Sequence, residues 1–310
     1  MRRKNIKSVL SRKMAGWLKH VDDESVREAI REDALVCGGA ITSMLMGEQV
    51  NDYDVYFRTK ASALAVARYY VQKFKDNPPP RFADSDALVN IEAREMDGRI
   101  KIVVKSQGIA GESGTDDYRY FEQVDDDAAT GSFVENVTSD AKEAVKDEEA
   151  AKPKYRPKFL TSNAITLSNR LQVVIRFCGE IEDIHHNYDF IHCMCGWDYG
   201  GKKLVIPQEA VESMLAKHLV YRGSLYPICS LIRTRKFIAR GWTIDAGQYV
   251  KMAWDTHALD LNDINVLEDQ MVGVDAAYFY EVLDILRKGI ASGKALDRTY
   301  LMEVIDRVFS

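Results

Sequence analysis

The feature that most constrains the fold of this chain is a short apolar run that stops at a pair of glycines. The run spans residues 34–37 and is followed directly by Gly38 and Gly39. Residues 40–47 can form two helical turns, and residues 52–57 have the period of a strand. This order predicts a strand, a tight turn, a helix and a second strand, because glycines after an apolar run mark a turn.

The rest of the chain divides into a mixed region and a helical region. We expect a helix over residues 62–75, a hairpin of strands 87–95 and 99–105 around Asp97 and Gly98, strands at 159–167, 171–177 and 188–195, and a short helix over 181–187. Beyond Trp197 the character changes, and residues 208–309 have helical periodicity in nearly every window. The fold class is therefore predicted to be α+β, with a mixed sheet flanked by helices and an all-helical part after it.

Charge divides the chain further, although the net charge is only −5. Residues 109–152 contain thirteen acidic and four basic residues, so the remainder is mildly basic. We predict a basic arm or helix over residues 1–22, a head over 23–200 with a flexible acidic insert at 109–157, and a helical body over 201–310. The insert is most simply a solvated excursion, and it could also bind a basic protein partner or mimic nucleic acid.

The first twenty residues contain seven basic residues and no acid. This pattern is typical of an arm that binds nucleic acid or an anionic surface, and an organelle transit peptide has the same pattern. The alternative is a basic amphipathic helix, whose inner side would carry Val9, Leu10, Met14, Trp17 and Leu18.

Composition excludes several classes of protein. With 46% hydrophobic and 29% charged residues the chain is typical of a soluble globular protein, and no apolar run reaches 18 residues, so we expect no membrane span. Five cysteines are an odd number in a chain with no apolar signal sequence, which favours reduced thiols and a cytoplasmic location.

Two acids on the second strand carry the chemistry that we expect. Asp52 and Asp54 lie two residues apart, so on a strand they share a face at roughly 7 Å. Paired carboxylates suit two Mg²⁺ ions, with Mn²⁺ as a substitute. The alternative is an ordinary turn followed by a strand whose acids face solvent.

The glycine turn would supply the binding site for a nucleoside triphosphate. A backbone without a Cβ atom lets phosphates approach, and the amides at a helix N-terminus face an anion. Gly38 and Gly39 would take this role, and the hydroxyls of Thr42 and Ser43 could add donors to the phosphates.

This combination resembles the signature of the DNA polymerase β nucleotidyltransferase superfamily: a hydrophobic residue and a glycine pair, then Asp-hydrophobic-Asp. The superfamily has a third carboxylate on a later strand, and Asp189 matches it by order along the chain. The resemblance implies that Asp52 and Asp54 ligate both metal ions. It also implies that Asp189 helps to ligate the ion that activates the acceptor hydroxyl.

A second resemblance concerns the start of the helical region. Residues 226–235 and 241–245 are similar to the neck of class II CCA-adding enzymes and bacterial poly(A) polymerases, with Cys229 and Ile232 in place of two arginines of that pattern. By this resemblance Arg233, Arg235 and Lys236 would contact the triphosphate. An ordinary solvated helix face is the alternative.

The function expected from these features is transfer of a nucleoside monophosphate from an NTP to a hydroxyl, with release of pyrophosphate. The preferred acceptor is an RNA 3′ end of the tRNA kind, and protein or small-molecule hydroxyls are alternatives. A non-catalytic binding or structural module that keeps the fold is a further alternative, for example a bacteriophage virion component. For a phage-encoded protein the expected location is the host cytoplasm, with association with the virion as an alternative. Cys193 and Cys195 with nearby histidines suggest zinc less strongly than they suggest buried thiols.

Overall fold

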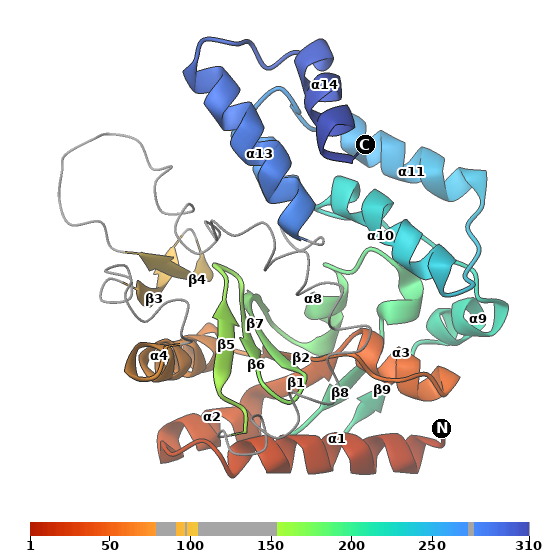
Figure 1. The fold of residues 1–310 in the computed structure, drawn as a ribbon. Coiled ribbons are helices and arrows are strands. Elements are labelled where there is room, and N and C mark those ends of the chain that lie inside the picture. The colour runs from red at the N-terminus through yellow and green to blue at the C-terminus, as the bar shows by residue number, and fades with distance from the viewer. Residues whose placement is uncertain (79–90, 97, 105–153, 272–275, 310) are drawn as a thin grey trace, which may run out of the picture. The chain divides into compact units, whose positions relative to one another are not determined.

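The computed structural model describes residues 1–78, 91–96, 98–104, 154–271 and 276–309. The described residues form two compact units (Figure 1). The first holds the described residues of 1–104 with 154–186 and 192–214, and the second holds 187–191 with 215–309. Most of the expected acidic insert lies outside the described residues.

A mixed sheet forms the centre of the first unit. Among the described residues it has seven strands in the order β5-β6-β7-β2-β1-β8-β9, in which β2 and β7 are parallel and the other neighbours antiparallel. The strands are β1 (Ala34–Cys37), β2 (Tyr53–Phe57), β5 (Pro157–Leu160), β6 (Ala164–Leu167), β7 (Leu171–Cys178), β8 (Gly196–Asp198) and β9 (Leu204–Val205). The mixed α+β class and the first strand–helix–strand order are therefore confirmed.

The helices of the first unit each bury apolar side chains. They are α1 (Arg3–Leu18), α2 (Glu24–Asp33), α3 (Gly39–Met46), α4 (Lys60–Asp76), α8 (Ile181–His185) and α9 (Gln208–Ala216). The basic N-terminus forms α1, which lies below the strands in Figure 1 and buries Ile6, Leu10, Met14 and Trp17. The indole nitrogen of Trp17 donates a hydrogen bond of 2.5 Å to the hydroxyl of Tyr70 on α4.

Burial alternates along β7 and shows that the two faces of the sheet differ. Leu171, Val173 and Ile175 are buried, whereas Gln172 and the other alternate residues are only half-buried. This period of two is the one expected for a strand with one apolar face. The partly open face is the one that carries Asp54 of β2, because Asp54 is in register with Gln172.

The expected hairpin is confirmed. β3 (Ile91–Met96) and β4 (Arg99–Val104) are antiparallel with Met96 opposite Arg99, and they form a separate two-stranded sheet. The amide of Ile102 donates to the carbonyl of Ser162, which attaches the hairpin to the turn between β5 and β6.

Two of the expected strands are wrong. The strand expected over 159–167 is a hairpin of β5 and β6, because the hydroxyl of Thr161 accepts from the amides of Asn163 and Ala164 and turns the chain. The strand expected over 188–195 is a 3₁₀ turn, η3 (Ile191–Cys193), followed by β8. Here Phe190 forms an isolated bridge with Tyr221, so a distant segment decides the local backbone.

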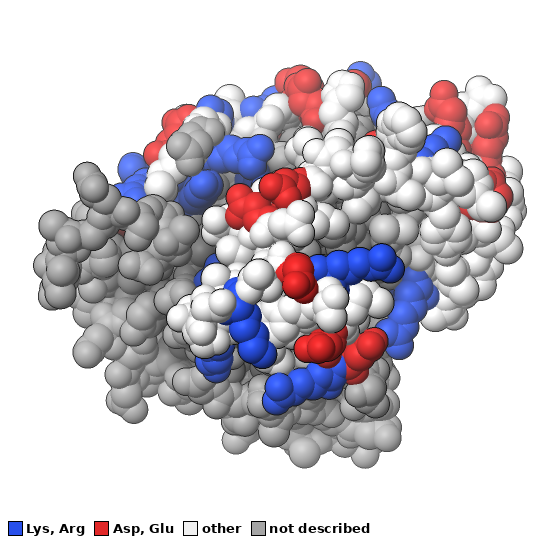
Figure 2. Space-filling view, turned by 90° about the horizontal axis from the view of Figure 1, so that it is seen from above, with Lys and Arg blue, Asp and Glu red and all other residues white. Residues whose placement is uncertain are grey.

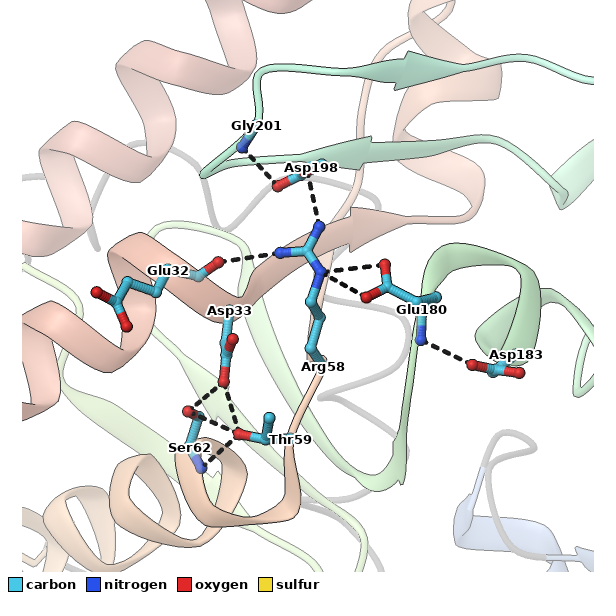
Figure 3. A network of polar contacts seen from close by, with 9 residues as sticks. All are labelled: Glu32, Asp33, Arg58, Thr59, Ser62, Glu180, Asp183, Asp198 and Gly201. Atoms are coloured by element: carbon cyan, nitrogen blue, oxygen red, sulfur yellow. Dashed lines mark hydrogen bonds and ion pairs between the residues drawn. The ribbon is translucent and has the colours of Figure 1, made fainter.

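One end of the sheet is joined by a polar network around Arg58, which follows β2 directly (Figure 3). Its guanidinium contacts Asp198 of β8 at 2.7 Å, both carboxylate oxygens of Glu180 at 3.0 Å, and the carbonyl of Glu32 at 3.0 Å. Beside it, Asp33 accepts from the hydroxyls of Thr59 and Ser62. The network connects α2, β2, β8 and the residue that precedes α8.

The second unit is helical, as expected for this part of the chain. Its helices are α10 (Pro227–Ala239), α11 (Ala246–His257), α12 (Ile264–Met271), α13 (Ala276–Ala291) and α14 (Arg298–Phe309). Its apolar core contains Leu267, Val282, Leu283, Leu286 and Val304. In the part of the chain that the structure describes, no helix has the length and apolar character that a membrane crossing needs.

Candidate functional site

Gly38 makes the turn between β1 and α3 possible. Its φ of 92° and ψ of −151° lie in a region that is essentially restricted to glycine. Its amide donates to the carbonyl of Cys195 at 2.9 Å, which holds the turn against the residue before β8. A Cβ atom on Gly39 would meet nothing within 4 Å, so the first residue of α3 borders open space. The sequence-predicted strand, glycine turn and helix are therefore confirmed.

Asp54 lies on the partly open face of the sheet, near this turn. It is half-buried and pairs in register with Cys37 of β1 on one side and with Gln172 of β7 on the other. Asp52 is exposed and precedes β2, which begins at Tyr53. The structure thus places Asp54 one strand away from the glycine turn, and Asp52 at the point where the chain enters β2.

Thr42 and Ser43 lie in α3 but are buried. The hydroxyl of Thr42 donates a hydrogen bond of 2.6 Å to the carbonyl of His192, and it also contacts the thiol of Cys195. Thr42 therefore fastens the η3 turn to α3. Its expected contact with phosphate stays a prediction and would compete with this bond.

Three cysteines of the first unit are held in their neutral form. Burial, with a smaller contribution from the carboxylate of Asp54, raises the pKa of Cys37 far above its ordinary value. Burial also raises the pKa of Cys195 to about 12 and that of Cys178 to about 11. Among the described residues no group of three or more His, Cys, Asp or Glu side chains could hold a metal ion.

Lys13 of α1 is a residue near the site that the sequence analysis did not single out. Its ammonium group donates to the carbonyl of Asn169 and lies 4.7 Å from the ring centre of Tyr53 and 5.4 Å from that of Tyr155. Burial, followed by the charge of Arg170, lowers the pKa of Lys13 to about 8, and the charge of Asp52 opposes the shift. No local signal distinguishes Lys13 from the other six basic residues of the N-terminus.

Asp189 belongs to the second unit and is buried. One of its carboxylate oxygens accepts from the hydroxyl of Ser230 at 3.1 Å and from the guanidinium of Arg233 at 3.0 Å. Both donors lie on α10, which begins at Pro227. The expected role of Asp189 as a metal ligand stays a prediction.

The three basic residues that the neck resemblance singled out share α10. Arg233 is paired with Asp189, whereas Arg235 and Lys236 are exposed. Figure 2 shows one face of the molecule, on which basic and acidic residues are interspersed. The described residues on this face therefore form no surface of a single charge. The contact of these residues with a triphosphate remains a prediction.

Comparisons with known proteins bear on most of the chain. Residues 8–217 match the family model described as "Gabija anti-defense 2 family protein". One relative, "Gabija anti-defense 2" of Bacillus phage SPbetaL7, is 19% identical over 259 residues, which cover 82% of this chain and 45% of the relative.

Similar solved structures include two CCA-adding enzymes. The Thermotoga maritima enzyme complexed with tRNA has a TM-score of 0.38 at 11% identity, with 79% of this chain and 45% of that chain covered. The Bacillus stearothermophilus enzyme in complex with CTP has a TM-score of 0.37 at 11% identity, with 86% and 50% covered. The chain thus spans about half the length of these relatives.

Proposed function

This chain belongs to the Gabija anti-defense 2 family, and we propose that it is a metal-dependent nucleotidyltransferase. The reaction would transfer a nucleoside monophosphate from an NTP to a hydroxyl group and release pyrophosphate. We place it in the cytoplasm of an infected cell, since a relative comes from a bacteriophage.

The observation that supports the proposal best is the junction of β1, α3 and β2. Gly38 adopts a backbone conformation that favours glycine, and the first residue of α3 borders open space. The N-terminal amides of α3 can then face phosphate oxygens, because a helix N-terminus carries partial positive charge. Asp54 lies on the strand next to β1, in register with Cys37, the last residue before the turn.

The donor set suits divalent cations that prefer oxygen. Asp52 is exposed and Asp54 is half-buried, and carboxylate oxygens are ligands that Mg²⁺ prefers. Asp52 and Asp54 would hold Mg²⁺ or Mn²⁺, which would supply charge stabilisation for the attacking and leaving oxygens. The residues of this chain would mainly position the triphosphate, since phosphoryl chemistry depends on positioning and electrostatic stabilisation.

The basic residues expected to contact phosphate belong to α10 of the helical unit. Arg235 and Lys236 are exposed on α10, and Asp189 fixes the direction of Arg233. In this proposal Asp189 has a positioning role for Arg233, and its expected role as a metal ligand is tested separately below.

We propose an RNA 3′ end as the acceptor to test first. The support is α1, on which Arg3, Lys4, Lys7 and Arg12 form no ion pair with a described residue. Unpaired cations on one helix suit a phosphate backbone. The description of the family favours a second candidate, in which the chain acts on a defence component by binding it or by modifying one of its hydroxyls.

Incubation of the protein with Mn²⁺ or Mg²⁺ and each α-labelled NTP, with RNA oligomers and with protein acceptors, tests the proposal. We expect label on RNA from the unaltered protein and loss of labelling by at least about a hundredfold in Asp54→Asn, because that change removes a charged metal ligand. Asp76→Asn, an exposed acid at the end of α4, is the matched control. Label on protein alone would favour the second acceptor, and no label with any acceptor would contradict the catalytic proposal.

A further inference from the structure

One row of side chains crosses the sheet beside the glycine turn. In register, Thr166 of β6 lies next to Gln172 of β7, Gln172 next to Asp54 of β2, and Asp54 next to Cys37 of β1. Residues paired in register on neighbouring strands share a face of the sheet. The side chain of Gln172 therefore stands beside that of Asp54, on the partly open face.

The amide of Gln172 is available for a ligand. It is half-buried, and its side chain makes no hydrogen bond with any residue that the structure describes. Its neighbours along the strand, Leu171 and Val173, are buried on the opposite face, which fixes the side on which Gln172 lies. Because the amide is free of protein partners and lies next to Asp54 in register, its oxygen can turn toward a ligand held by that carboxylate.

Among the described residues no cluster of three His, Cys, Asp or Glu side chains could hold a metal ion, although Asp52 and Asp54 are only two residues apart. Asp189 lies in the other unit, where Ser230 and Arg233 already donate to its carboxylate. The third oxygen ligand of an ion held by Asp52 and Asp54 thus has a candidate in the same unit that is not an acid.

We propose that the side-chain oxygen of Gln172 is the third protein ligand of the divalent cation that Asp52 and Asp54 hold. This inference rests on the proposed function, and it replaces an expected carboxylate with a neutral amide. Amide and carboxylate oxygens both suit Mg²⁺, Mn²⁺ and Ca²⁺. Two charges in place of three weaken the attraction for a cation, so the ion binds more tightly when a nucleotide brings its own phosphate oxygens.

Binding of Mn²⁺ to the purified full chain, followed by electron paramagnetic resonance of the free ion, tests this without any need for activity. We expect Gln172→Ala to weaken Mn²⁺ binding by about tenfold, as loss of a ligand or its support does in other metal sites. Gln172→Glu should tighten binding, because it adds a negative charge at the same place. Gln72→Ala, an exposed glutamine on α4, is the matched control and should change nothing.

The two proposals fail in different ways. If Asp54→Asn abolishes binding of Mn²⁺ while Gln172→Ala leaves the affinity unchanged, Gln172 is not a ligand and the proposed function stands. If Asp189→Asn weakens binding as much as Asp54→Asn, the third ligand is Asp189 and the inference is overturned. No binding of Mn²⁺ by the unaltered chain, with or without NTP, would overturn both proposals. Gln172→Met keeps the length of the side chain and removes its oxygen, so it decides the question if Gln172→Ala does not fold.

Discussion

At the scale of single residues, the two glycines of the turn have different physical roles. Gly38 has a positive φ, which side chains with a Cβ atom rarely adopt, whereas Gly39 begins α3 with open space beside it. Only the first glycine is required by the backbone. The second is required only if a ligand approaches closely, and substitution can separate these two reasons.

We expect Gly38→Ala to lower the free energy of unfolding by about 1–3 kcal/mol, because alanine must adopt a strained conformation there. Gly39→Ala should change it by less than about 0.5 kcal/mol, since nothing lies within 4 Å of the new methyl group. Gly39→Ala should nevertheless weaken NTP binding. Urea unfolding and calorimetric nucleotide titration check both variants. Unchanged NTP affinity in Gly39→Ala would count against phosphate contact at the start of α3.

The protonation of Lys13 makes the stability of the folded chain depend on pH. Burial lowers the pKa of Lys13 to about 8, below the ordinary value of 10.5. Between these two values the unfolded chain binds more protons at this residue than the folded chain does, so this contribution makes stability rise with pH. Below the lower value the cost of the buried charge is present in full.

The measurement is the free energy of unfolding of the unaltered chain and of Lys13→Gln at about pH 7 and about pH 10. We expect the free energy of unfolding of the unaltered chain to rise relative to that of Lys13→Gln between these two pH values. This holds whichever of the two proteins is the more stable at about pH 7. Lys19→Gln, an exposed lysine that follows α1, serves as the control. Parallel pH profiles for all three proteins would show that Lys13 keeps its ordinary pKa.

At the scale of elements, the Arg58 network connects segments that are far apart in the sequence (Figure 3). The side chain of Asp198 is only 11% exposed and that of Arg58 23%, so loss of the arginine leaves a carboxylate with little access to water. The amide of Gly201 also donates to Asp198, and this bond reduces the free-energy cost of losing the arginine. Breaking an ion pair at the surface costs less, because water can solvate the remaining charge. The pair of Lys60 with Glu95 in the same unit provides this comparison.

Arg58→Met should lower the free energy of unfolding by roughly 2 kcal/mol, because it removes the cation that pairs with the largely buried carboxylate of Asp198 and the donor to the carbonyl of Glu32. Lys60→Met removes the pair with Glu95, whose side chains are 49% and 48% exposed, and should cost less than about 1 kcal/mol. Thermal and urea unfolding of the two variants check the contrast. Equal losses would mean that the network adds no more than a surface pair.

At the scale of the whole molecule, charge is separated along the chain. The net charge is −5, yet the first twenty residues contain seven basic residues and no acid. Five of the seven lie in α1, a helix whose apolar side is buried, which corresponds to the amphipathic alternative of the sequence analysis. If RNA is the acceptor, α1 is the place where its phosphates are expected to bind.

We expect RNA binding to weaken steeply with salt. The combined change Lys4→Gln, Lys7→Gln and Arg12→Gln should reduce the slope of log affinity against log salt by about 1 for each cation that no longer meets a phosphate. A triple variant with the same change in net charge, Arg99→Gln, Lys203→Gln and Lys217→Gln, is the control. Fluorescence anisotropy over a salt series measures both. Equal slopes would mean that net charge alone, and not α1, governs binding.

The sequence by itself determined the features that depend on neighbouring residues. An apolar run before Gly38, an Asp-Gly pair between two strands and the period of the C-terminal third correspond to β1, the β3–β4 hairpin and the helices of the second unit. These elements follow from local sterics and from burial of one face, which spacing reveals. The paired acids near the glycine turn could be predicted for the same reason.

Only the tertiary structure decided the features that depend on distant partners. Residues 188–195 form no strand because Phe190 pairs with Tyr221 and Arg233 binds Asp189. The places of Lys13 beside Tyr53 and of Gln172 beside Asp54 follow from packing and strand register, which join residues far apart in the chain. Spacing along a sequence contains no record of register between strands, and the free energy of burying a charge depends on every group around it.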